Sequence, residues 1–171
     1  MANLHEIEDA LNILLKSGLQ KNKITILHCT TAYPTPFKYV NLNSMLAIKE
    51  KFNVNVGYSD HTKGLEVSIA AAALGATVIE KHFTLDRKLD GPDHKASIEP
   101  EELKSLVESI RNIENALGTN NKNVTSIELG NMKVARKSLV ATKSIKCGET
   151  FSESNLTTKR PGNGMSPMLW D

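Results

Sequence analysis

Residues 54–62, VNVGYSDHT, join a short apolar run to a cluster of polar and reactive side chains. The apolar half, residues 54–58, has the length and composition of a buried strand. Ser59, Asp60 and His61 follow where that strand meets its loop. Because alternate side chains of a strand face opposite sides, Ser59 and His61 share one face and Asp60 lies on the other. We interpret the first face as part of a site and Asp60 as a structural partner of the loop.

Apolar runs of strand length alternate with helical segments on both sides of this stretch. The predicted strands lie at residues 24–28 and 54–58, with a third that starts at residues 77–79 and leads to His82. The predicted helices lie at residues 4–15, 42–52, 65–74 and 100–117. Pro100 marks a helix start, and Gly18, Gly75 and Gly118 mark helix ends. The order α-βα-βα-βα predicts an α/β fold in which helices cover a parallel sheet.

The pattern changes after residue 118. Residues 119–131 are rich in Asn, Ser and Thr, which is typical of a linker. Beyond it, short β pieces with turns between them are predicted at residues 134–141, 143–149 and 156–160. The sequence therefore predicts an α/β domain over 1–118, a linker over 119–131 and a small β-rich domain over 132–171.

The number of βα units limits the fold of the first domain. Three units cannot close a (β/α)8 barrel, which typically takes about 250 residues. The chain also begins on a helix with no strand before it. We therefore expect a piece of a longer protein, or one partner of an assembly.

Composition argues against several classes of protein. The 171 residues are 40% hydrophobic and carry a net charge of +2 without a dense Lys/Arg cluster, so neither a nucleic acid nor an acidic membrane is an expected partner. Cys29 and Cys147 lie far apart in sequence, which fits a reducing, cytoplasmic location. The acidic N-terminus is unlike a signal peptide, and the longest apolar stretch, residues 69–74, is too short to span a bilayer.

Two histidines carry the chemistry that the sequence suggests. His61 and His82 are 21 residues apart, the length of one βα unit, so both are expected at the same edge of the sheet. Two converging imidazoles suit a divalent transition metal. Glu80 shares a strand face with His82 and is a candidate to orient a metal-bound water. The alternative is that each histidine merely caps its strand through a backbone hydrogen bond.

Further polar groups follow these strands. The loop DGPDHKAS, residues 90–97, offers Asp93 and His94 to the same edge, although Gly-Pro-Asp is also ordinary turn chemistry. The hydroxyls of Ser59 and Thr62 are candidates to hold a phosphate or a sugar hydroxyl. The stretch RPGNG lies in the β-rich tail, so it lacks the strand-to-helix context of a nucleotide-binding loop.

Several longer motifs resemble those of one enzyme family. HCTTAYPTP, GYSDHT, ATVIEKHFTLD, GPDHKASIEPEEL and, in the tail, LTTKRPGNGMSP resemble the sialic acid synthases, or N-acetylneuraminate synthases, in the same order over nearly the whole chain. Members of that family condense phosphoenolpyruvate with N-acetylmannosamine or a related 2-acetamido sugar and release phosphate. The resemblance implies the last part of a TIM barrel followed by most of a small antifreeze-like (SAF) domain, from a domain-swapped homodimer.

The resemblance also implies roles for individual residues. His61 and His82 resemble ligands of manganese, for which magnesium and cobalt are alternatives, and Ser59 resembles a ligand of the phosphoenolpyruvate phosphate. The implied sugar contacts are Tyr33, Asp93 and, from the partner subunit's tail, Arg160. Of the carboxylates present, Glu80 and Asp93 are the catalytic candidates, whereas the family's lysines for phosphoenolpyruvate and its catalytic carboxylates would belong to an N-terminal half.

One position departs from the family pattern. Some members carry Asn where Thr31 stands, and that Asn touches the sugar, so the identity of the sugar stays open. Two other interpretations remain. The first is a non-catalytic product of a truncated or split gene that serves as a dimerising or sugar-binding module. The second is another phosphoenolpyruvate-condensing barrel enzyme that makes an eight- or seven-carbon keto acid, against which the SAF-like tail argues. In every case we expect no turnover from the 171-residue chain alone.

Overall fold

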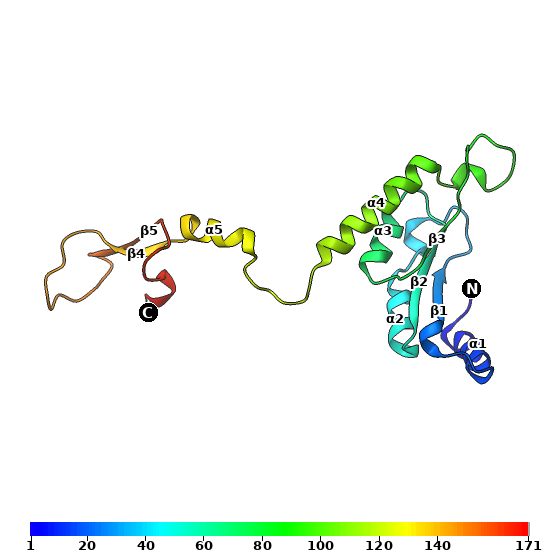
Figure 1. Ribbon diagram of the computed structural model, residues 1–171, viewed down its shortest axis with the longest axis horizontal. Coiled ribbons are helices and arrows are strands. Elements are labelled where there is room, and N and C mark those ends of the chain that lie inside the picture. The colour runs from blue at the N-terminus through cyan, green and yellow to red at the C-terminus, as the bar shows by residue number, and fades with distance from the viewer. Residues whose placement is uncertain (171) are drawn as a thin grey trace. The chain divides into compact units, whose positions relative to one another are not determined.

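The computed structural model describes residues 1–170, and these residues form two compact units that divide after Gly118 (Figure 1). The first unit is a mixed α/β structure and the second is a small unit with one helix and two strands. Both units are built from short elements. No helix within residues 1–170 has the length and apolar character that crossing a membrane requires.

A three-stranded parallel sheet forms the centre of the first unit. Its elements are α1 (Leu4–Lys16), β1 (Thr25–Cys29), α2 (Asn43–Phe52), β2 (Asn55–Asp60), α3 (Glu66–Ala73), β3 (Ile79–Lys81) and α4 (Pro100–Leu117). The strands pair in the order β1-β2-β3, with β2 between two parallel neighbours. Helices α2 and α3 pack on the sheet, and α4 packs on α3 (Figure 1). The predicted α/β class and parallel sheet are confirmed.

Capping side chains define where the helices of this unit begin. The side chain of Asn3 accepts hydrogen bonds from the backbone of His5 and Glu6, and the Glu6 carboxylate accepts one from the backbone of Asn3 in return. Helix α4 has the equivalent reciprocal pair in Glu99 and Glu102, with Pro100 at its first position. Such boxes satisfy backbone donors that have no partner inside the helix.

The core of the unit lies between the sheet and its helices. Its buried members are Leu11, Ile24, Val40, Met45, Ile48, Phe52, Val54, Val56, Tyr58 and Ala71. Gly57 interrupts the apolar run of β2 for a packing reason, since a Cβ at this position would lie 2.6 Å from the carbonyl oxygen of Val78. The absence of a side chain therefore lets the segment before β3 approach β2 closely.

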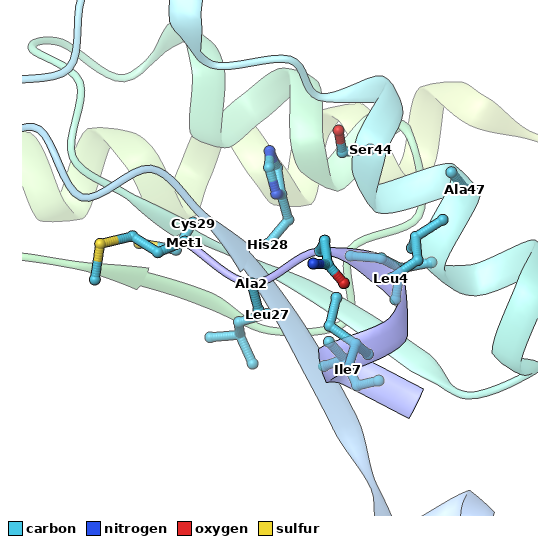
Figure 2. A pocket seen from close by; sticks show the side chains of 12 residues that line it. Met1, Ala2, Leu4, Ile7, Leu27, His28, Cys29, Ser44 and Ala47 are labelled. Atoms are coloured by element: carbon cyan, nitrogen blue, oxygen red, sulfur yellow. The ribbon is translucent and has the colours of Figure 1, made fainter. Parts of the chain in front are cut away.

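A cavity of about 470 Å³ lies between the N-terminal segment, β1 and α2 (Figure 2). Met1, Ala2 and Leu27 line it on one side, and Ser44 and Ala47 line it from α2. β1 is the edge strand of the sheet at this point. The histidine pair predicted from the sequence does not line this cavity, so the cavity is a feature of the sheet edge and not of the predicted site.

The second unit corrects three expectations. Its elements are α5 (Ser126–Ala135), β4 (Ser138–Ala141) and the antiparallel β5 (Leu156–Lys159). The segment 119–131, predicted as a linker, contains the start of α5, because Thr125 and Glu128 form a capping box there. The predicted strand at 134–141 begins only at Ser138, since α5 occupies its first residues.

Residues 143–149, predicted as a β piece, form loop and turn structure instead. The backbone N–H of Glu149 donates to the carbonyl oxygen of Lys146, and the Glu149 carboxylate accepts from the backbone N–H of Lys146. Gly148, at a φ of 85°, supplies the left-handed conformation that the turn needs. Turn geometry therefore overrides the alternating pattern of this segment.

Candidate active site

His61 and His82 lie side by side at the carboxyl ends of neighbouring parallel strands. Their ring centroids are 5.2 Å apart and the rings meet edge to face at 82°. β2 ends at Asp60 and β3 at Lys81, so each histidine is the first residue beyond its strand. The expectation that a 21-residue spacing brings the two imidazoles to one edge of the sheet agrees with this geometry.

The Nδ1 atom of each imidazole faces a protein oxygen. His61 Nδ1 is 2.9 Å from the carbonyl oxygen of Thr30, and because a carbonyl only accepts, Nδ1 carries the proton and Nε2 keeps its lone pair. His82 Nδ1 lies 3.7 Å from Asp93 Oδ2. A backbone hydrogen bond, the alternative weighed for these histidines, is thus present at His61. It leaves Nε2 free to bind another group.

Tyr33 covers both imidazoles. Its ring centroid is 4.2 Å from that of His82 and 5.3 Å from that of His61. Its hydroxyl donates to the carbonyl oxygen of Asp93, at 3.3 Å, and lies 3.2 Å from Ser97 Oγ. The loop after β1 and the loop after β3 therefore meet above the histidine pair, and Tyr33 and Asp93 both belong to the site.

Ser59 and Glu80 lie on the same face of the sheet, two residues before the histidines. They are register partners on β2 and β3, and Ser59 Oγ donates to Glu80 Oε1 at 2.6 Å. Ser59 is buried, whereas Glu80 is exposed. The hydroxyl predicted to hold a phosphate and the carboxylate predicted to orient a water are thus bonded to each other.

Asp60 lies on the opposite face, where it is fully buried. Its carboxylate accepts from the backbone and hydroxyl of Thr62, from Ser68 Oγ and from Lys81 Nζ. The prediction that Asp60 is a structural partner of the loop is confirmed. Thr62, a candidate to hold a phosphate or a sugar hydroxyl, is itself buried, and its hydroxyl donates to Asp60.

Arg87 fastens the loop that carries Asp93. Its Nε donates to the carbonyl oxygen of Ser97, its backbone N–H to Glu99 Oε1, and its guanidinium to the Glu102 carboxylate. The hydrogen bond between Arg87 and Glu102 raises the pKa of Arg87 and lowers the pKa of Glu102. This clamp was not predicted from the sequence. The one sign of it there is the stretch Glu-Pro-Glu-Glu, residues 99–102, at the start of the following helix.

Three further predicted residues are Thr31, His94 and Arg160. Thr31 is exposed in the loop after β1. His94 Nδ1 lies 2.7 Å from Thr84 Oγ1, so its contact is within its own loop. Arg160 belongs to the second unit, where its Nε donates to the carbonyl oxygen of Ala135 at 2.7 Å. The roles that the resemblance implies for Thr31 and Arg160 stay predictions.

Cys29 is a neighbour of the site that the sequence analysis did not assign to it. It ends β1 opposite Ser59, and its Sγ lies 3.9 Å from His61 Nδ1. No group of three or more His, Cys, Asp or Glu side chains with a metal-binding arrangement occurs within residues 1–170. The chain therefore offers a divalent transition metal two imidazole nitrogens, and waters or other oxygen ligands would have to complete the shell.

Comparison with known proteins identifies the family of this chain. Residues 1–122 match the sequence model of the NeuB family. The chain belongs to the NeuB family. This family contains the enzymes that the motifs resembled, and the resemblance to sialic acid synthases is confirmed.

Individual NeuB relatives share much of the sequence. The chain is 58% identical to N,N'-diacetyllegionaminic acid synthase of Campylobacter jejuni over 171 residues, which are 100% of this chain and 51% of the relative. It is 44% identical to a pseudaminic acid synthase of Campylobacter jejuni over 86% of this chain and 43% of the relative. The chain spans about half the length of the curated relatives it matches.

A solved NeuB-type structure has a similar fold. The N-acetylneuraminic acid (sialic acid) synthetase of Leptospira borgpetersenii, crystallised with citrate, superposes with a TM-score of 0.69 and 37% sequence identity. The match covers 77% of this chain and 45% of that chain. The mixed α/β architecture with a parallel sheet is therefore one that a sialic acid synthetase also has.

Proposed function

We propose that this NeuB-family chain is part of a nonulosonic acid synthase that condenses phosphoenolpyruvate with a 2-acetamido sugar and releases phosphate. The observation that carries the proposal is the imidazole pair of His61 and His82 at the carboxyl ends of two parallel strands, 5.2 Å apart. Relatives named as legionaminic and pseudaminic acid synthases support the same reaction class.

The name of one of these relatives supports one class of sugar. N,N'-diacetyllegionaminic acid carries two acetylated nitrogens, and phosphoenolpyruvate contains none. Both nitrogens of such a product must therefore come from the sugar. At 58% identity to that synthase, we propose a diacetamido sugar as the substrate, with N-acetylmannosamine as the alternative that the test below includes.

The reaction forms one carbon–carbon bond and breaks one carbon–oxygen bond. The methylene carbon C3 of phosphoenolpyruvate attacks the aldehyde carbon of the open-chain sugar, and the aldehyde oxygen takes up the displaced electron pair and a proton to become a hydroxyl. The new carbon–carbon bond leaves C2 of the enol phosphate electron-deficient. Water adds to C2 and loses a proton, and the bond from C2 to the phosphate oxygen then breaks to release phosphate and form the keto acid. None of these steps requires a covalent bond to the protein.

Residues of this chain have distinct tasks in the reaction. Ser59 holds the phosphate, Glu80 orients the attacking water, and Tyr33 and Asp93 bind the sugar above the histidines. Nε2 of His61 and of His82 would hold a divalent metal, for which we propose manganese, with magnesium and cobalt as alternatives. A metal bound there supplies Lewis-acid polarisation of the sugar aldehyde.

The architecture of the whole protein is also a proposal. The parallel sheet with its polar carboxyl edge supports a segment of a TIM barrel over residues 1–118, since active sites of such barrels lie at that edge. The antiparallel pair of β4 and β5 supports a SAF domain over residues 132–171. In the complete protein we propose a domain-swapped homodimer in which Arg160 reaches the partner's site.

A chimera tests the function directly. Residues 1–171 replace the aligned half of the Campylobacter jejuni relative, and phosphate release and product mass are measured with phosphoenolpyruvate, Mn²⁺ and either a diacetamido sugar or N-acetylmannosamine. We expect turnover with the diacetamido sugar and none from residues 1–171 alone. A folded chimera without turnover on either sugar would refute the proposal and favour a non-catalytic dimerising or sugar-binding module.

A further inference from the structure

A buried ion pair lies on the face of β2 and β3 opposite the histidine pair. Asp60 Oδ2 and Lys81 Nζ are 3.0 Å apart, and their side chains are 0% and 5% exposed. Asp60 directly precedes His61 in the chain, and Lys81 directly precedes His82. Each charged residue is thus one backbone step from one imidazole.

Hydrogen bonds fix both members of the pair. The Asp60 carboxylate accepts from the backbone N–H and the hydroxyl of Thr62, both at 2.8 Å, and from Ser68 Oγ at 2.5 Å. Lys81 Nζ donates a second time, to the carbonyl oxygen of Thr62 at 2.7 Å. The pair therefore ties together the end of β2, the loop after His61, helix α3 and the end of β3.

The position of the pair in the ladder matters. Asp60 and Lys81 are register partners and form the last rung between β2 and β3 before both chains leave the sheet. Beyond this rung His61 and His82 no longer pair with each other's strand, and their carbonyl oxygens accept from the backbone N–H groups of Thr35 and Ile98. A buried ion pair is weak evidence for net stability, because apolar residues of similar volume often replace one without loss. The hydrogen bonds of the pair are directional, however, so they fix the positions of the two strand ends relative to each other.

We propose that Asp60 and Lys81 form a positioning pair, which holds the imidazoles of His61 and His82 at their edge-to-face separation and so sets the metal affinity of the site. The part concerning the metal rests on the proposed function. The part concerning ring geometry rests only on the contacts given above. The pair touches neither imidazole through its own side chains, so it acts through the strand ends.

The first measurement is a nuclear Overhauser effect between the ring protons of His61 and His82 in the metal-free 171-residue chain. The second is titration of the same chain with Mn²⁺ alone. We expect Lys81→Met and Asp60→Asn each to abolish the His61–His82 signal. We also expect each to weaken Mn²⁺ binding by about 10- to 100-fold, the usual effect of losing a group that orients a metal ligand.

Two controls separate positioning from general stability. The rings of His28 and Tyr58, 5.9 Å apart on the same sheet, give a reference signal that should persist in both variants. Lys51→Met removes a lysine of an exposed ion pair with Glu8 and should leave both signals and the Mn²⁺ affinity unchanged. A Lys81→Met chain that keeps the His61–His82 signal and its Mn²⁺ affinity overturns the proposal.

A milder variant keeps the proposal testable if Lys81→Met prevents folding. Where Lys81→Met loses the His28–Tyr58 signal as well, Ser68→Ala decides, because it removes one hydrogen bond from Asp60 and keeps both charges. A weakened His61–His82 signal beside an intact reference supports positioning, and an unchanged one refutes it. A wild-type chain that binds no Mn²⁺ refutes the metal role in the proposed function, while the ring signals still test the positioning pair.

Discussion

Ser59 Oγ donates a hydrogen bond of 2.6 Å to Glu80 Oε1 across the ladder between β2 and β3. A serine hydroxyl has one proton to donate. A phosphate that binds at Ser59 must therefore replace the Glu80 carboxylate as the acceptor of the serine hydrogen bond. It must also lie close to the negative charge of Glu80. The Glu80 carboxylate consequently competes with the phosphate for the Ser59 hydroxyl, although the sequence suggested separate tasks for the two residues.

This competition gives opposite expectations for the two side chains. In the chimeric synthase, Ser59→Ala should raise the KM for phosphoenolpyruvate by about tenfold, the value of one hydrogen bond to a charged group. Glu80→Gln should lower that KM, because the repelling charge is gone, and should lower kcat, because the water is oriented less well. Ser105→Ala, on an exposed face of α4, is the matched control. An unchanged KM in Ser59→Ala would remove Ser59 from the phosphate site.

The histidine pair gives the most direct test of the metal. His61→Ala or His82→Ala should abolish manganese-dependent condensation in the chimera, and each should lower Mn²⁺ affinity by more than the roughly 100-fold that loss of an orienting partner costs. His5→Ala, at the exposed start of α1, should change neither quantity. Full activity in the double variant would show that these imidazoles hold no catalytic metal.

The clamp of the Asp93 loop should make stability depend on acidity. The hydrogen bond from Arg87 lowers the pKa of Glu102 in the folded chain below its ordinary value of 4.5. The unfolded state then binds protons at a higher pH than the folded state does, so stability falls on acidification. The contribution of Glu102 is fully present above pH 4.5 and is lost as the pH falls through the depressed pKa.

Urea unfolding at several pH values checks this expectation. The wild-type chain should lose stability in acid more steeply than Glu102→Gln, which cannot titrate at that position. Glu101→Gln, the neighbouring carboxylate on α4, is the matched control and should behave as the wild type. If the free energy of unfolding falls with pH equally steeply in the wild type and in Glu102→Gln, the titration of Glu102 contributes nothing to stability.

Much of the first unit could be predicted because its signals are local. Pro100, Gly18 and Gly118 lie at or beside the observed helix boundaries, and each apolar run overlaps a strand, although the third strand begins at Ile79 and not at Thr77. The spacing of His61 and His82 placed them on neighbouring strands, since one βα unit separates successive parallel strands. The same 21-residue interval separates Ser59 from Glu80 and Asp60 from Lys81.

The rest depended on contacts that a single sequence does not display. Lys81 resembles any surface lysine until its register opposite Asp60 is known. Arg87 binds Glu99 and Glu102 only because the loop after β3 folds back onto the start of α4. In the second unit, the capping box of Thr125 and Glu128 was visible in the sequence but was outweighed by the polar composition around it.

Thr31 is the position at which sugar preference should change. It is exposed in the loop after β1, next to Thr30, whose carbonyl oxygen accepts from His61. In the chimera, Thr31→Asn should shift the ratio of kcat/KM between the diacetamido sugar and N-acetylmannosamine by about tenfold, since an added amide can pair with one sugar and not with the other. The KM for phosphoenolpyruvate should stay constant. An unchanged ratio would place Thr31 outside the sugar site.

Mixing two inactive subunits tests the domain-swapped dimer. A chimera with His61→Ala keeps Arg160, and one with Arg160→Ala keeps His61, so each alone should have very low activity. If Arg160 acts on the partner's site, a mixed dimer contains one complete site, and random reassociation of a two-fold dimer should restore about a quarter of wild-type turnover. Mixing without any gain, while mixed dimers are detected by native mass spectrometry, would place Arg160 in its own subunit's site or outside the reaction.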